Sequence, residues 1–345
     1  MKKFLLASLP FSIALSLALI LLSLGSSDPL QAIQAFFLTP FSNVFFLGNL
    51  LDEAGLILLC ALGFLLGMRM GVFNLGGEGQ VYLGALVAAE IAVQLPSLPF
   101  PLGLLLGIAA AILATAAIGG FSTLLWRYLA INELISTFLI SSALIPLIDF
   151  ALSGPLRDQA NNLLASPAVS GDFRLWRFFA PSNLNSGIFL AIVLALGLFF
   201  VMKRTRWGYE MRLTGDSREF AQTQGVRVKF LVFISLSLGA AFQGLAGALS
   251  VYGTHHAAFT GISSGLGWNG IAAALIGRNH PLGAVAGALV FAWLGAGAQA
   301  AMIHSNISFE LSTIIQGTVF LLVTIQAKPW RSFSPKVKPS ARTPS

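Results

Sequence analysis

Residues 203–230, KRTRWGYEMRLTGDSREFAQTQGVRVKF, decide how the chain folds, because they are its only long, strongly charged segment between hydrophobic runs. The segment holds seven basic residues: Lys203, Arg204, Arg206, Arg212, Arg218, Arg227 and Lys229. Lysine and arginine at the ends of hydrophobic runs are typical of connections on the cytoplasmic side of a membrane. The segment therefore indicates the orientation of the hydrophobic runs on either side of it.

The same segment predicts one short helix, over residues 217–224. Asp216 has a side chain preferred at a helix N-cap, Glu219 follows three residues later, and Gly225 supplies the left-handed residue that commonly ends a helix. Isolated helices shorter than about 12 to 15 residues are marginal in water, so we expect this one to pack against another surface. The alternative is a solvated loop whose basic residues only set the membrane orientation.

The composition predicts an all-α polytopic membrane protein. Of 345 residues, 56% are hydrophobic and only 10% are charged, and the mean hydropathy is +0.82. Soluble domains carry about 25% charged residues, and runs of about 17 to 25 apolar residues are long enough to cross a membrane as helices. The net charge of +7 follows from the ends of these runs, so we expect no nucleic acid partner. The single cysteine, Cys60, excludes a disulfide within the chain.

Apolar runs predict about ten hydrophobic helical segments. They are residues 4–24, 44–67, 81–95, 102–125, 133–152, 187–202, 231–251, 265–277, 282–302 and 309–327, with a further short helix at the membrane surface over 30–38. For the segment 265–277, a full crossing and a re-entrant segment both remain open. The first run is longer than the apolar part of a secretion signal, so we interpret it as a retained span. Asn132 is expected to cap the segment that begins at Glu133.

Counting basic residues predicts the orientation. With both termini in the cytoplasm, all but three of the 20 Lys and Arg residues lie inside, the exceptions being Arg157, Arg174 and Arg177. Residues 1–327 then form one transmembrane domain with a large outer loop at 153–186. Residues 328–345 form a basic tail that we expect to be disordered.

Two glycine-rich stretches carry polar residues at membrane depth. In GVFNLGGEGQ, residues 71–80, glycines permit backbone turns, while Asn74, Glu78 and Gln80 need polar partners. No Gly-Lys-Ser/Thr follows, so the stretch is not a phosphate-binding loop. GLGWNG, residues 265–270, matches a dinucleotide fingerprint in form only, because no strand precedes it. A simple helix break and a role in a solute path both remain open for the first stretch.

Further polar residues suit contact with hydroxylated or aromatic solutes, namely Gln243, Trp268 and Asn269, although helix packing explains them equally well. Glu90 and Asp149 should face protein or water, since a carboxylate facing lipid is costly. His255 and His256 are adjacent and have no third ligand in sight, so we expect no metal site. No catalytic constellation is evident, and we expect no cofactor and no catalysis on this chain.

Four motifs together resemble the permeases of ABC importers for branched-chain amino acids, ribose and nucleosides. GYEMRL with the following Gly215, Asp216 and Phe220 resembles the cytoplasmic loop of that family, and FNLGGEGQ is similar to its FNIGxEGQ signature. NELIST, residues 132–137, and the region 265–283 are the other two matches. The FNLGGEGQ form is nearest to nucleoside, simple-sugar and riboflavin permeases.

The resemblance implies a bacterial inner-membrane permease that transports a ribosyl or ribityl solute, with simple sugars as the alternative. Its partners would be ATPase subunits, a second permease or a copy of itself, an extracellular substrate-binding protein, and membrane lipid. The loop 203–230 would couple the permease to the ATPase through these residues: Glu210, Arg212, Gly215, Asp216, Arg218, Glu219 and Phe220. An ion-coupled secondary transporter is the competing class, and it would require functional carboxylates deep in the membrane. A membrane-bound enzyme is the third.

Overall fold

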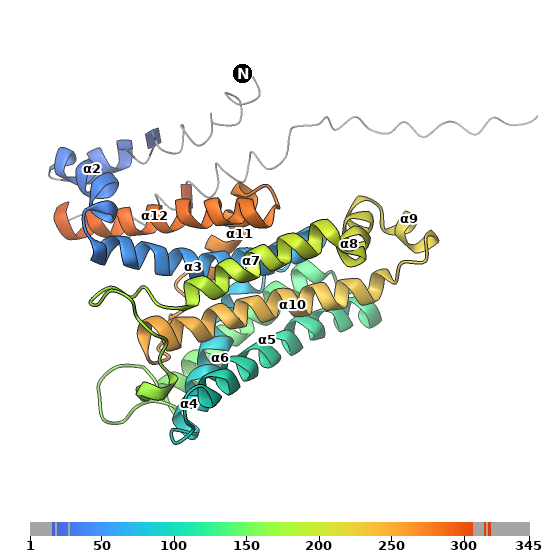
Figure 1. The fold of residues 1–345 in the computed structure, drawn as a ribbon, viewed down its shortest axis with the longest axis horizontal. Helices are drawn as coiled ribbons and strands as arrows, with labels where there is room; N and C mark the ends of the chain where they lie inside the picture. Colours follow the sequence, from blue (N-terminus) through green and yellow to red (C-terminus); the bar gives the residue numbers. More distant parts are fainter. Residues whose placement is uncertain (1–15, 18, 27, 306–313, 315–316, 319–345) are drawn as a thin grey trace, which may run out of the picture.

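The computed structural model describes residues 16–305 except 18 and 27, together with 314, 317 and 318. Long helices run side by side along the longest axis of the molecule (Figure 1), and the described residues contain no β-strand beyond two isolated bridges. The helices are α2 (Pro29–Leu38), α3 (Val44–Met68), α4 (Gly77–Gln94), α5 (Leu102–Leu129), α6 (Glu133–Ser153), α7 (Gly187–Arg204), α8 (Arg206–Asp216), α9 (Arg218–Thr223), α10 (Val228–Leu249), α11 (Leu266–Ile276) and α12 (Pro281–Ser305). Short 3₁₀ turns cover Thr39–Phe41 and Gly171–Phe173, and a π-helical turn, Ser250–His255, extends α10.

Six of the described helices are long and apolar enough to cross a membrane: α3, α5, α6, α7, α12 and α10 with its π-helical extension. The all-helical membrane fold is therefore confirmed, whereas the count of about ten segments is not. The expected segment 265–277 forms α11, whose 11 residues measure only about 16 Å, roughly half of a hydrocarbon core of about 30 Å. Most of the expected segments 4–24 and 309–327, and the whole tail 328–345, lie outside the described residues.

The start of helix α4 also differs from the prediction. It begins at Gly77 rather than at the expected residue 81, so that Glu78 and Gln80 lie on its first turn. This polar start keeps α4 out of the set of apolar spanning helices.

The helix α3 lies at the centre of the bundle. Of the 18 most apolar consecutive residues of α3, 89% are buried, and the corresponding shares are 33% in α5, 22% in α6 and 28% in α7. It packs against α7, α10, α11 and α12. A helix that is apolar all round must be buried in protein or lipid, so α3 forms the core while α5, α6 and α7 present much of their surface outward.

The two ends of the bundle differ in character. At one end, Asp52 of α3 accepts hydrogen bonds from Asn185 Nδ2 at 2.6 Å and from Thr254 Oγ1 at 2.7 Å, which anchors the end of the loop 154–186. At the other end, α8 and α9 protrude beyond the long helices, on the right in Figure 1. The polar segment 203–230 therefore lies at the opposite end from the loop 154–186.

Close helix packing at glycine predicts a stability effect that can be measured. A Cβ added to Gly84 of α4 would lie 2.5 Å from the Cα of Gly244 in α10, so these two helices would have to separate. We expect Gly84→Ala to destabilise the protein by about 1 to 3 kcal/mol, the usual cost of overpacking, and to lower its melting temperature in detergent. Gly197→Ala on α7 is the matched control, because its added Cβ would meet nothing within 4 Å. Equal melting temperatures for the two variants would contradict the close packing of α4 on α10.

Candidate functional site

The charged segment 203–230 contains two consecutive helices rather than one. Thr205 caps α8, its Oγ1 accepting from Gly208 N at 3.2 Å, and Ser217 caps α9, its Oγ accepting from Phe220 N at 3.3 Å. The predicted cap at Asp216 was therefore wrong by one residue, since Asp216 is the last residue of α8. Ser217 takes the cap position because its backbone is extended, with φ −159°. This extended residue interrupts the helical backbone and separates α8 from α9. The left-handed Gly225, with φ +79°, is confirmed.

Contacts within the chain hold α8 in place. The guanidinium of Arg212 donates to the carbonyl of Met202 in the last turn of α7, where a positive charge stabilises unpaired carbonyls. Gly215 lies against the carbonyl of Arg69, and there is no room for a side chain between them. Glu210 pairs with Arg206 one turn earlier at 2.7 Å. Three of the four predicted coupling residues of α8, namely Glu210, Arg212 and Gly215, thus make contacts inside the chain.

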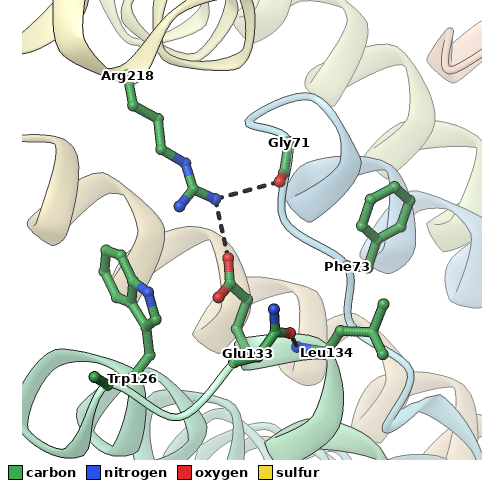
Figure 2. Close-up of a pocket in the computed structure, with 8 residues that line it drawn as sticks. Gly71, Phe73, Trp126, Glu133, Leu134 and Arg218 are labelled. Carbon is green, nitrogen blue, oxygen red and sulfur yellow. Dashed lines mark hydrogen bonds and ion pairs between the residues drawn. The ribbon is translucent and has the colours of Figure 1, made fainter. Parts of the chain in front are cut away.

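Arg218 points from α9 toward the bundle (Figure 2). Its Nη2 donates to Glu133 Oε1 at 2.9 Å and to the Gly71 carbonyl at 3.2 Å, and its guanidinium lies 5.6 Å from the centre of the Trp126 ring. Glu133 begins α6, Trp126 lies near the end of α5, and Gly71 belongs to the connection between α3 and α4. One side chain therefore ties α9 to three other parts of the bundle.

Partial burial of this ion pair makes the loss of one partner more costly than it is at an exposed pair. The Glu133 side chain is only 9% exposed, whereas that of Arg218 is 35% exposed. Exposed pairs contribute about 0 to 1 kcal/mol, but removing one partner of a buried pair leaves a charge that is neither paired nor solvated. Loss of Arg218 would leave Glu133 in that state.

A hollow of about 450 Å³ lies beside the ion pair. Its lining combines apolar and polar groups: Gly71, Phe73, Trp126, Ala130, Asn132, Glu133, Leu134 and Arg218 (Figure 2). Asn132 caps α6 as expected, with its Oδ1 accepting from Leu134 N at 2.9 Å. Arg218 is the one residue of α9 in this lining.

The remaining predicted coupling residues face away from the bundle. Asp216, Glu219 and Phe220 are exposed, and 51% of the Phe220 side chain is accessible. Ala221, the next residue, is buried against the bundle. The helix α9 thus has one face fixed by Arg218 and Ala221 and an opposite face that carries Glu219 and Phe220, while Asp216 at the end of α8 is also exposed.

The predicted solute-path residues fall into two groups. Asn74, Gln80 and Gln243 are buried, and Asn74 Nδ2 donates to Gln80 Oε1 at 2.9 Å. Trp268 and Asn269 lie at the bundle surface on α11, and Trp268 is 39% exposed. The first group therefore lies inside the bundle, and the second lies at its surface.

Glu78 and Gln243 have specific partners inside the bundle. The carboxylate of Glu78 accepts from Gly265 N at 2.8 Å and from Gly267 N at 3.1 Å. Gln243 Nε2 donates to the Cys60 carbonyl at 3.1 Å, while its Oε1 has no hydrogen-bond partner among the described residues. Glu78 therefore connects α4 to the start of α11, and Gln243 connects α10 to α3.

The other polar residues singled out in the sequence are accounted for locally. Asp149 accepts from the Tyr82 hydroxyl at 2.5 Å, which confirms that it faces protein. Burial, together with the nearby charges of Arg177 and Arg174, lowers the pKa of His256 to about 4, so this imidazole is neutral at pH 7. Within the described residues, no three His, Cys, Asp or Glu side chains lie together as a metal site would require.

Comparison with known families now places the chain. The family described as "Branched-chain amino acid transport system / permease component" matches residues 46–324, which include every spanning helix listed above apart from the first two residues of α3. The chain belongs to this permease family.

Named relatives of the permease span most of its length. It is 34% identical over 318 residues to the probable riboflavin import permease protein RfuC of Treponema pallidum, covering 90% of this chain and 82% of that protein. It is 27% identical to the guanosine ABC transporter permease protein NupP of Bacillus subtilis, with 82% of each chain covered. It is 28% identical to the glucose ABC transporter permease protein TsgB13 of Haloferax volcanii, covering 86% of this chain and 80% of that protein. No solved structure matches this permease.

The partners of Arg218 were not foreseen from the permease sequence. In the sequence, Glu133 is only the first residue of the predicted segment 133–152, and nothing marks Trp126 or Gly71 as its neighbours. The one available signal was that Glu133 belongs to a family motif, NELIST, and that signal says nothing about its partner.

The ion pair predicts how firmly α9 is held. In Arg218→Ala, the contacts to Glu133 and Gly71 are lost, so we expect chymotrypsin to cleave at Phe220 several-fold faster, as followed by mass spectrometry. Arg206→Ala is the control, because Arg206 is 91% exposed and pairs only within α8. If both variants are cleaved at the wild-type rate, Arg218 does not hold α9.

Proposed function

We propose that the chain is the permease subunit of an ATP-driven importer for riboflavin or a nucleoside, that is, for a solute with a ribityl or ribosyl group. Family membership carries the transport part of this proposal. The identity of 34% to a riboflavin permease and 27% to a guanosine permease supports the solute class. A simple sugar is the second candidate, favoured by the 28% identity to a glucose permease.

In this proposal, the α8–α9 end faces the cytoplasm and the loop 154–186 faces outward. The separation of these two segments to opposite ends of the bundle supports the orientation, as does the excess of basic residues at the α8–α9 end. An extracellular binding protein would deliver solute to the outer end, and a second permease, or another copy of this one, would complete the path. The permease itself has no catalytic step, because the ATPase partners hydrolyse ATP.

The exposed face of α9 is the proposed docking surface for the ATPase. Phe220 provides the apolar anchor, and Asp216 and Glu219 provide charges at its rim, an arrangement common in protein interfaces. Arg212, Gly215 and Arg218 are not docking contacts in this account. Their contacts inside the chain hold α8 and α9 on the bundle.

Movement of the docked ATPase would reach the bundle through Arg218. When the ATPase dimer closes on ATP, it displaces α9, and the guanidinium passes that displacement to Glu133 of α6 and to the connection after α3. A six-residue helix alone has too little packing to move other helices. The ion pair between Arg218 and Glu133 attaches α9 to α6 and so lets it move the bundle.

Removal of the aromatic anchor should uncouple the importer. We expect Phe220→Ala to lower ATP-driven solute uptake by about tenfold or more in proteoliposomes, because truncating a hot-spot side chain at the centre of an interface weakens docking by about 2 kcal/mol or more. Phe200→Ala is the matched control, since Phe200 is 61% exposed on the apolar surface of α7. Wild-type uptake by Phe220→Ala would refute the docking role.

The solute class has a direct test in the cognate extracellular binding protein. Thermal-shift measurements with riboflavin, guanosine and glucose side by side should show stabilisation by riboflavin or guanosine, because a ligand that binds only the folded state raises its melting temperature. Stabilisation by glucose alone would replace the proposed solute class with simple sugars.

A further inference from the structure

The helices α4 and α11 meet at their N-termini inside the bundle. A Cβ on Gly77, the first residue of α4, would lie only 3.2 Å from the Cα of Gly267, in the first turn of α11. Gly270 of α11 packs against Cys60, which precedes the end of α3 by eight residues, or about 12 Å. We call the contact between Gly77 of α4 and Gly267 of α11 the α4–α11 joint.

A single carboxylate closes the joint. The two oxygens of Glu78 accept from Gly265 N at 2.8 Å and from Gly267 N at 3.1 Å, two backbone amides at the start of α11 that its own hydrogen-bonding pattern leaves free. Glu78 also lies in the first turn of α4. Because both helix N-termini carry partial positive charge, the carboxylate offsets two dipole ends that would otherwise repel each other.

Little else bonds the two helices at this point. The facing residues Gly77 and Gly267 have no side chains to interlock, and their backbones touch directly. Loss of the Glu78 hydrogen bonds would therefore leave mainly van der Waals contact between two like helix ends. The joint is therefore closed by two hydrogen bonds of one side chain, and these can break together.

The layer beneath the joint contains an unsatisfied polar atom. Gln243 is fully buried, and a Cβ on Gly77 would lie 3.2 Å from its Nε2. Its Oε1 has no partner among the described residues, and a buried acceptor without a hydrogen bond is costly. If the joint opens and water reaches Oε1, this oxygen gains a hydrogen bond and its burial cost disappears. The free-energy difference between the closed and the open joint is therefore smaller than the burial of α11 alone implies.

The joint reaches the surface of the bundle on one side. Glu78 is partly exposed, and Asn269, in the first turn of α11, is partly exposed as well. Trp268 beside it is 39% exposed. Water or a solute at that surface can therefore reach the joint once the helices part.

We propose that Glu78 is a positioning residue that latches the α4–α11 joint, and that this joint parts and closes again in each transport cycle. The inference rests on the proposed transport function. It assigns Glu78 the task of holding α11, in place of the direct solute contact that its polar character first suggested.

Cys60 is a native reporter of the joint. It is the only cysteine of the chain, it is fully buried, and it lies against Gly270 and Gln243. Labelling by N-ethylmaleimide, followed by mass spectrometry of this chain within the complete importer in nanodiscs, measures how often the joint opens.

The comparison is between Glu78→Gln and Glu90→Gln, the same chemical change at a partly buried carboxylate farther along α4. We expect Glu78→Gln to raise the labelling rate of Cys60 about tenfold, since it removes the negative charge and one of the two acceptor oxygens that bond the start of α11. Glu90→Gln should stay near the wild-type rate, and Glu78→Asp, which keeps the charge, should fall between the two. Equal rates in Glu78→Gln and Glu90→Gln would overturn the latch.

A second measurement needs no variant and so remains valid if Glu78→Gln misfolds. In the wild-type importer, ATP together with the solute-loaded binding protein should raise Cys60 labelling above the resting rate, and an unchanged rate would overturn the opening of the joint in the cycle. Solute uptake is recorded on the same samples. If ATP drives no uptake in the wild type, the proposed function fails, while the resting labelling rates of the variants still decide whether Glu78 holds the joint.

Discussion

The hydrogen bonds of the Arg218 guanidinium are the constraint on which the arrangement of the α8–α9 end depends. A six-residue helix is not stable alone, and α9 buries little besides Ala221. Arg218 compensates by contacting Glu133, Gly71 and Trp126 at once, and the low exposure of Glu133 makes loss of the pair costly. A helix held in this way can transmit force without being part of the core.

The contacts beyond Arg218 lead toward the α4–α11 joint. Gly71, which accepts from Arg218, starts the connection that ends at Gly77, and the N–H of Leu75 in that connection donates to Thr137 Oγ1 of α6 at 3.1 Å. One turn further, Gly79 N donates to Ser141 Oγ at 2.8 Å, next to Glu78. A continuous set of hydrogen bonds therefore joins α9, α6 and the first turn of α4. Our hypothesis is that a shift of α9 is passed along these hydrogen bonds and strains the contacts of Glu78 with the start of α11.

Hydropathy and capping patterns predicted much of the fold but little of the site. The expected segment 44–67 is α3, Val44–Met68, and the cap at Asn132 is confirmed, because both depend on residues adjacent in sequence. The segment 265–277 matches α11 within one residue at each end, whereas the start of α4 at Gly77 was missed, since it is set by packing at the joint. The partners of Arg218 and Glu78 were also missed. Arg218 and Glu133 are 85 positions apart and Glu78 and Gly265 are 187 apart, so no local pattern links them.

The most direct test of the central claim is the ratio of solute uptake to ATP hydrolysis in the reconstituted importer carrying Glu133→Gln. This change keeps the size of the side chain and removes the charge that holds Arg218. If Arg218 transmits the movement of α9, hydrolysis will continue while uptake per ATP falls by about tenfold, as expected for the loss of a charge-assisted contact. If uptake per ATP stays at the wild-type value, the ion pair does not transmit that movement and the account is wrong.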